Sequence, residues 1–172
     1  MDTSNPNSNA SNQSRAVKTE DRIFLVVADD SEEVHVALHF ACQRAKKNNG
    51  RIGLLSVQSN AEFHHWVGVG NLMAQEGRES AEETMAVLAK KAQKHMGEEP
   101  IKFYREGNAA EELVKLIDEV PEICIVILGC SYNGEGPGPI ISHLMGKRVC
   151  HLPVPLTIVP GDLSDSEIAA LG

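Results

Sequence analysis

The sequence predicts a three-layer α/β/α sandwich around an open, five-stranded parallel sheet. Short apolar segments alternate with helical segments five times between residues 23 and 159. These segments are continuously apolar rather than alternating with polar residues, which is typical of strands buried on both faces. Connections that contain a helix join neighbouring strands in parallel by right-handed crossovers. Helices are therefore expected on both faces of the sheet.

Local patterns place the individual elements. The expected strands are the apolar segments at 23–28, 51–58, 101–105, 123–128 and 156–159. The expected helices lie between Ser31 and Asn48, over 79–95, between Asn108 and Val120, over 139–150 and from Ser164 to Leu171. Ser31 and Asn108 are predicted N-caps, and Ser164 with Glu167 has the spacing of a capping box. Residues 59–77 form a long connection, which in a compact domain is either functional or partly helical.

The ends of the chain differ from its middle. Residues 1–20 alternate Asn and Ser with few apolar residues, which predicts a disordered N-terminal tail before a domain at 21–160. Residues 161–172 form a C-terminal extension with a short helix. We expect no signal peptide and no membrane span, because no apolar run approaches about 20 residues. The net charge of −8 argues against non-specific binding to nucleic acid, and four cysteines without a CxxC pair favour the cytoplasm.

Ligands of open parallel sheets bind at the carboxyl ends of the strands. Ala28 and Asp29 end the first strand, and Val57 lies near the end of the second. The carboxylate of Asp29 could accept hydrogen bonds from a ribose, or Asp29 or Asp30 could cap the following helix. Val57 could line an adenine pocket or belong to the core.

A glycine-rich loop follows the fourth strand. Its glycines permit a nest of backbone N–H groups around a phosphate, although Pro137 and Pro139 remove two donors. The alternative is a rigid turn into the helix at 139–150. The candidate phosphate contacts are Gly129, Ser131, Gly134, Gly136, Gly138, Ser142, Gly146 and Lys147.

Other side chains suggest weaker hypotheses. His35, His39 and Cys42 share one helical face, but no further ligand cluster accompanies them, so no metal is expected. The run from His64 to Trp66 could close over a ligand, although anchoring of the loop or contact with a partner is favoured. No nucleophile with a matching base is evident, so we predict a protein without catalytic residues, with slow ATP hydrolysis as a variant.

Three motifs together resemble the universal stress protein family over residues 21–160. The segment from Val26 to Glu32 is similar to that family's first-strand motif, and the segment from Leu152 to Val159 resembles its last strand. Between them, nine residues separate Gly136 from Gly146. ATP-binding members carry Gly-x2-Gly-x9-Gly-Ser/Thr, whereas here six residues separate Gly129 from Gly136, and Lys147 replaces the hydroxyl residue.

The resemblance implies a sheet of order 3-2-1-4-5, the arrangement of adenine nucleotide alpha hydrolase-like folds. It also implies a homodimer through the fifth strand, Pro155–Val159. By the same resemblance Asp29 would contact ribose and Val57 adenine, and Gly129, Gly136 and Gly146 would surround the phosphates.

The predicted function is therefore a stress-response protein that binds ATP or AMP and acts by binding rather than turnover. The alternative is a nucleotide-free dimeric adaptor that works through residues 59–77 and 161–172. A phospho-receiver domain is disfavoured, because no Asp occurs between Asp30 and Asp118 to follow the third strand.

Overall fold

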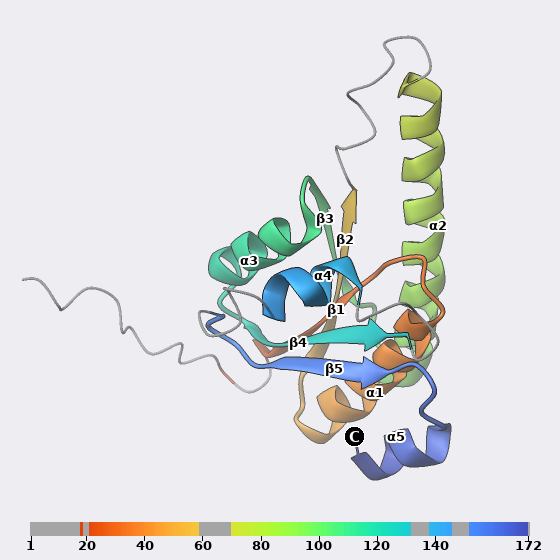
Figure 1. Ribbon diagram of the computed structural model, residues 1–172. Helices are drawn as coiled ribbons and strands as arrows, with labels where there is room; N and C mark the ends of the chain where they lie inside the picture. Colours follow the sequence, from red (N-terminus) through yellow and green to blue (C-terminus); the bar gives the residue numbers. More distant parts are fainter. Residues whose placement is uncertain (1–17, 19–20, 59–69, 132–137, 146–151, 172) are drawn as a thin grey trace, which may run out of the picture.

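The computed structural model of the chain describes residue 18 and residues 21–58, 70–131, 138–145 and 152–171 (Figure 1). The predicted tail at 1–20 lies outside the described residues apart from Lys18 and so stays a prediction. The side chains of residues 70–77 also lie outside that description.

The structure confirms the predicted sheet. Its strands are β1 (Ile23–Val27), β2 (Arg51–Gln58), β3 (Ile101–Glu106), β4 (Ile123–Cys130) and β5 (Leu156–Pro160). They form one sheet in the order β3-β2-β1-β4-β5, and every neighbouring pair is parallel. The carboxyl ends of β1 and β4, the two central partners, therefore lie side by side at one edge.

Helices cover both faces of this sheet, as the sequence predicts. They are α1 (Glu33–Lys47), α2 (Gly70–Met96), α3 (Ala109–Glu119), α4 (Pro139–His143) and α5 (Asp165–Leu171). Helices α1 and α2 bury their apolar side chains against one face, and α3 and α4 bury theirs against the other. The C-terminal helix α5 packs against α1 (Figure 1).

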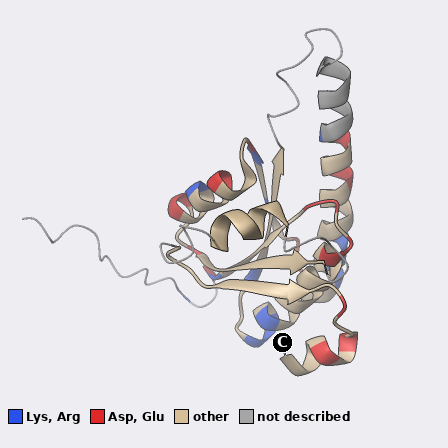
Figure 2. Ribbon diagram, in the orientation of Figure 1, with Lys and Arg blue, Asp and Glu red and all other residues tan. Residues whose placement is uncertain are grey.

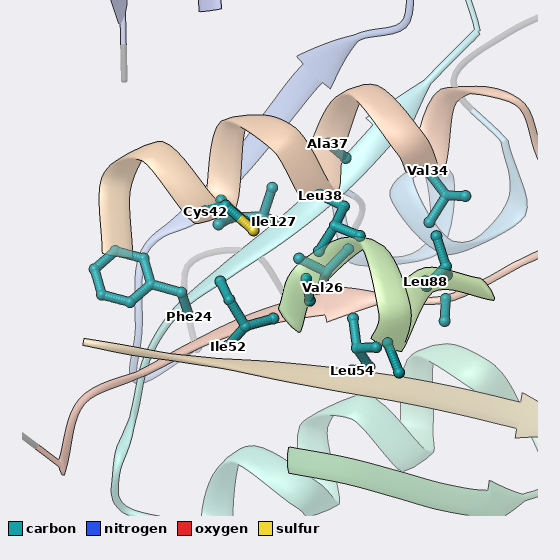
Figure 3. Close-up of a cluster of buried hydrophobic side chains, with 14 of the residues drawn as sticks. Phe24, Val26, Val34, Ala37, Leu38, Cys42, Ile52, Leu54, Leu88 and Ile127 are labelled. Atoms are coloured by element: carbon teal, nitrogen blue, oxygen red, sulfur yellow. The ribbon is translucent and has the colours of Figure 1, made fainter. Parts of the chain in front are cut away.

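Strand β1 contributes to both cores, which explains its uninterrupted apolar sequence. Phe24 and Val26 belong to the core beneath α1 and α2, whereas Ile23, Leu25 and Val27 belong to the core beneath α3. Figure 3 shows the first of these cores, where the side chains gather between the helices and the sheet. Leu25 is fully buried, and burial of such a side chain contributes about 1.5–3 kcal/mol.

Two of the predicted N-caps are present. The Asn108 Oδ1 accepts hydrogen bonds from the N–H groups of Ala110 and Glu111, both at 3.1 Å. Ser164 and Glu167 form a reciprocal capping box at the start of α5, in which the Ser164 N–H donates to the Glu167 carboxylate at 2.9 Å. Local sequence therefore determines where α3 and α5 begin.

Two other predicted boundaries need correction, and a third is tested only in part. Ser31 does not cap α1, because its N–H and hydroxyl both donate to Asp29 Oδ1, at 3.1 and 2.5 Å, and the helix begins at Glu33 without a side-chain cap. Helix α2 begins at Gly70 rather than at 79, so the long connection shortens to 59–69. The described helix α4 spans Pro139–His143, and residues 146–150 of the longer prediction lie outside the described residues.

Candidate functional site

A cavity of about 350 Å³ opens at the carboxyl ends of β1 and β4. Its size is at the lower end of the range for small-molecule pockets, roughly 300–1,000 Å³. Val27 and Leu128 from the strands, with Ile140 and Ile141 from α4, form apolar walls. The sequence predicts a ligand site at this edge of the sheet, and the cavity lies there.

Four predicted site residues line this cavity: Asp29, Gly129, Ser131 and Gly138. Gly138 precedes α4 with φ of +84°, a left-handed conformation that favours glycine. Asp29 is exposed at the cavity rim, and its Oδ1 holds the turn through Ser31. The N-cap residue of α1, Glu32, makes no side-chain capping hydrogen bond, and the hydrogen bonds of Asp29 and Asp30 go to Ser31 and Thr84.

The remaining predicted site residues lie elsewhere. Val57 is half-buried and lines a neighbouring cavity of about 350 Å³, which shares Ala109, Pro139 and Ile140 with the first. Ala28 is buried, with its N–H bonded to the Leu55 carbonyl at 2.7 Å, and Ser142 is exposed on α4; neither lines the two cavities. The other four candidates lie outside the described residues: Gly134, Gly136, Gly146 and Lys147.

Glu33 is a cavity residue that sequence reasoning missed. It occupies the first turn of α1, where the positive end of the helix dipole favours an anion. A hydrogen bond from the Ser131 hydroxyl, together with one from its own backbone N–H, lowers the pKa of the Glu33 carboxyl. An acidic residue in a first turn is a common sequence feature, so nothing local marked Glu33 as part of a site.

Two glycines make room for Glu33. A Cβ on Gly129, at the end of β4, would lie 2.8 Å from the carbonyl carbon and oxygen of Glu33, and 3.0 Å from its Cβ. A Cβ on Gly161, just after β5, would overlap Cγ of Glu33. Gly129 therefore allows the backbone of α1 to approach the sheet this closely, and Gly161 leaves room for the side chain of Glu33.

The charged side chains among the described lining residues are those of Asp29 and Glu33, and no Lys or Arg is among them. The turn between β1 and α1 is correspondingly acidic (Figure 2). Such a cavity can cover an apolar ring and accept hydrogen bonds from hydroxyl or amine groups. Its described residues pair hydroxyls with carboxylates, Ser31 with Asp29 and Ser131 with Glu33, and include no histidine, cysteine or lysine.

One histidine of α1, His39, contacts two other helices. His39 Nδ1 lies 3.1 Å from Asp165 Oδ1 on α5, and its ring stacks on His95 of α2 with centroids 4.9 Å apart. Cys42 is buried in the core. Within the described part of the chain, no group of three or more His, Cys, Asp or Glu side chains is placed to hold a metal ion. The run from His64 to Trp66 lies outside the described residues.

A doubly covered parallel sheet with a ligand-sized cavity at its strand ends defines a class of small-molecule-binding α/β proteins. The sequence profile of the Universal stress protein family matches residues 22–160. The chain therefore belongs to the universal stress protein family. None of the described helices is long and apolar enough to cross a membrane.

Solved structures of that family share the fold. The universal stress protein UspA from Lactobacillus plantarum superposes with a TM-score of 0.67 at 16% identity, covering 80% of this chain and 97% of that one. A universal stress protein from Archaeoglobus fulgidus in complex with dAMP superposes with a TM-score of 0.55 at 16% identity, covering 80% of this chain and 95% of that one. A universal stress protein in complex with cAMP superposes with a TM-score of 0.52 at 17% identity, covering 80% of this chain and 96% of that one. A comparison with curated protein sequences finds no match.

Proposed function

We propose that the chain is a stress-response protein that binds the adenosine part of an adenine nucleotide, such as ATP or AMP, in the cavity between β1 and β4. The observation that carries this proposal is the position of Asp29, a carboxylate at the rim of an apolar cavity at the end of β1. Two proteins of the same fold, solved with dAMP and with cAMP, support it.

The roles follow from the chemistry of each wall. Asp29 accepts hydrogen bonds from the ribose hydroxyls, since a carboxylate is a strong acceptor at a partly dry site. The apolar side chains of the cavity, with Val57 in the neighbouring one, cover the adenine ring. Gly134, Gly136, Gly146 and Lys147 stay predicted contacts for the phosphate end.

The protein acts by binding rather than by turnover in this proposal. The support is that the described residues lining the cavity include no histidine, cysteine or lysine to serve as an activated nucleophile or as a base near neutral pH. Incubation with ATP and chromatography of the products tests this directly. Release of ADP that depends on Asp29 would contradict it.

The binding proposal is tested by isothermal titration calorimetry with AMP. Wild-type protein is expected to bind, and Asp29→Ala to lose roughly 5- to 150-fold in affinity, because a ribose hydroxyl without its acceptor costs roughly 1–3 kcal/mol. Asp30→Ala is the matched control: Asp30 accepts a hydrogen bond from Thr84 at 2.7 Å and does not line this cavity. No heat with millimolar AMP, or equal losses in both variants, would refute the proposal.

A second candidate is a dimeric adaptor that works through protein partners. Strand β5 is an edge strand of the sheet, and Ile158 on it is 37% exposed, which favours pairing of the Pro155–Val159 segments of two copies. Native mass spectrometry tests this, with Ile158→Lys expected to give a monomer. We place either activity in the cytoplasm, which cell fractionation checks.

A further inference from the structure

We propose that Glu33 is a built-in anion of the cavity, so that the site takes an uncharged adenine nucleoside in preference to a polyphosphate. This inference rests on the proposed function and names the ligand class of the same site. Glu33 is a specificity-determining residue here, because it acts on the charge of the ligand rather than on any reaction.

The first support is the position of the carboxylate. The N-terminus of a helix of α1's length attracts anions, and phosphates often bind at such a terminus. Here Glu33, in the first turn of α1, places its own carboxylate on the cavity, and the Ser131 hydroxyl donates to it. Because these interactions lower the pKa of the Glu33 carboxyl, the group is ionised at neutral pH.

The second support is the fit of the surrounding backbone. Gly129 and Gly161 both lack the Cβ that would collide with Glu33. Gly161 also donates its N–H to the Cys130 carbonyl at 2.9 Å, which fixes the chain beside the end of β4. Two separate strand ends thus accommodate Glu33, so its place against the sheet is part of the fold. The closeness of Gly129 to Glu33 also gives that glycine a role that needs no phosphate.

The third support is the charge of the cavity. Asp29 and Glu33 bring two carboxylates, and no Lys or Arg is among the described lining residues to balance them. Coulomb repulsion between unit charges a few ångströms apart near a protein surface is large enough to change an affinity tenfold or more. A nucleoside brings hydroxyl donors and no charge, whereas each added phosphate brings negative charge close to these two carboxylates.

Calorimetric titration of the full chain with adenosine, AMP and ATP tests the inference. The titrations use EDTA and constant ionic strength, so that no magnesium neutralises the phosphates. Affinity is expected to fall at least tenfold from adenosine to ATP. Glu33→Gln, which keeps the shape of the side chain, is expected to raise ATP affinity at least tenfold while adenosine stays within twofold. Glu32→Gln is the matched control, because Glu32 is exposed, lies outside the cavity and carries the same charge.

The outcomes separate the two proposals. ATP binding as tightly as adenosine in the wild type, or equal gains in Glu33→Gln and Glu32→Gln, would overturn this inference and leave the proposed function intact. Failure of all three ligands to bind would overturn both. A measurement on the wild type alone guards against a variant that does not fold: the preference for adenosine must shrink when salt rises from 50 to 500 mM, since salt screens the repulsion. A preference independent of salt would overturn the inference.

Discussion

Replacement of Gly129 by Ala tests the contact between α1 and the end of β4. The new Cβ would lie 2.8 Å from two backbone atoms of Glu33, which cannot rotate away as a side chain could. Overpacking of this kind typically lowers the free energy of unfolding by about 1–3 kcal/mol. Because the clash is with backbone atoms, we expect a loss in the upper part of that range, about 2–3 kcal/mol. For a chain of this length each kcal/mol lowers Tm by roughly 2–4 °C, so we expect a decrease of roughly 4–12 °C. Thermal unfolding followed by circular dichroism measures it.

Ligand binding supplies a second readout for the same variant. Relief of the clash moves the first turn of α1, and Glu33 with it, so AMP affinity should change together with Tm. Gly97→Ala is the control, because its Cβ meets nothing within 4 Å and it costs only the strain of φ at +81°, roughly 1–2 kcal/mol. Gly97 lies beyond the C-terminal end of α2, so its replacement should leave AMP binding unchanged. A Gly129→Ala protein no less stable than Gly97→Ala would refute the reasoning.

Three further predictions concern the helices. Asn108→Ala removes the acceptor for two N–H groups of α3 and should cost about 1 kcal/mol, seen as a lower urea midpoint that Asn108→Asp restores. Burial lowers the pKa of His35 and of His95 in the folded state, so their contribution to stability is present above about pH 6.5 and is lost as the pH falls below it. The loss of stability between pH 7.5 and 5.5 should therefore be smaller in the His35→Gln, His95→Gln double variant, and an equal loss would contradict this. Burial raises the pKa of Cys42 to about 12, so mass spectrometry should find this thiol alkylated by iodoacetamide at pH 8 only after unfolding.

The sheet could be predicted because its signals are local. Continuous apolar runs such as Ile23–Val27 are buried on both faces and leave little ambiguity about period or length. The predicted start of α2 was wrong because Gly70 and Gly77 are poor helix formers, yet the helix begins at Gly70 and continues through Gly77. Ser31 was predicted as an N-cap from its residue type. In the structure its hydroxyl instead donates a hydrogen bond to the Asp29 carboxylate. Competition between neighbours for one hydrogen bond is not visible in residue preferences.

The candidate site divides in the same way. Asp29 could be found because the end of a parallel strand is recognisable in sequence and marks the ligand-binding edge. Glu33 could not be found in this way. Its partner Ser131, and the glycines that leave room for its side chain, lie about a hundred residues later in the chain. Only tertiary packing brings the first turn of α1 to the ends of β4 and β5.

The pairing of β1 with β4 has a consequence for how the protein is made. Ile23 pairs with Ile123, a hundred residues later in the chain, while β2 and β3 join the sheet from the intervening sequence. Closing so long a loop is entropically costly, so we expect this pairing late in folding. The cavity needs the ends of both β1 and β4. A nascent chain whose β4 segment is still inside the ribosome therefore has only one wall of the cavity. A ligand of this cavity can therefore stabilise only chains that have been made through α4 and have paired β1 with β4.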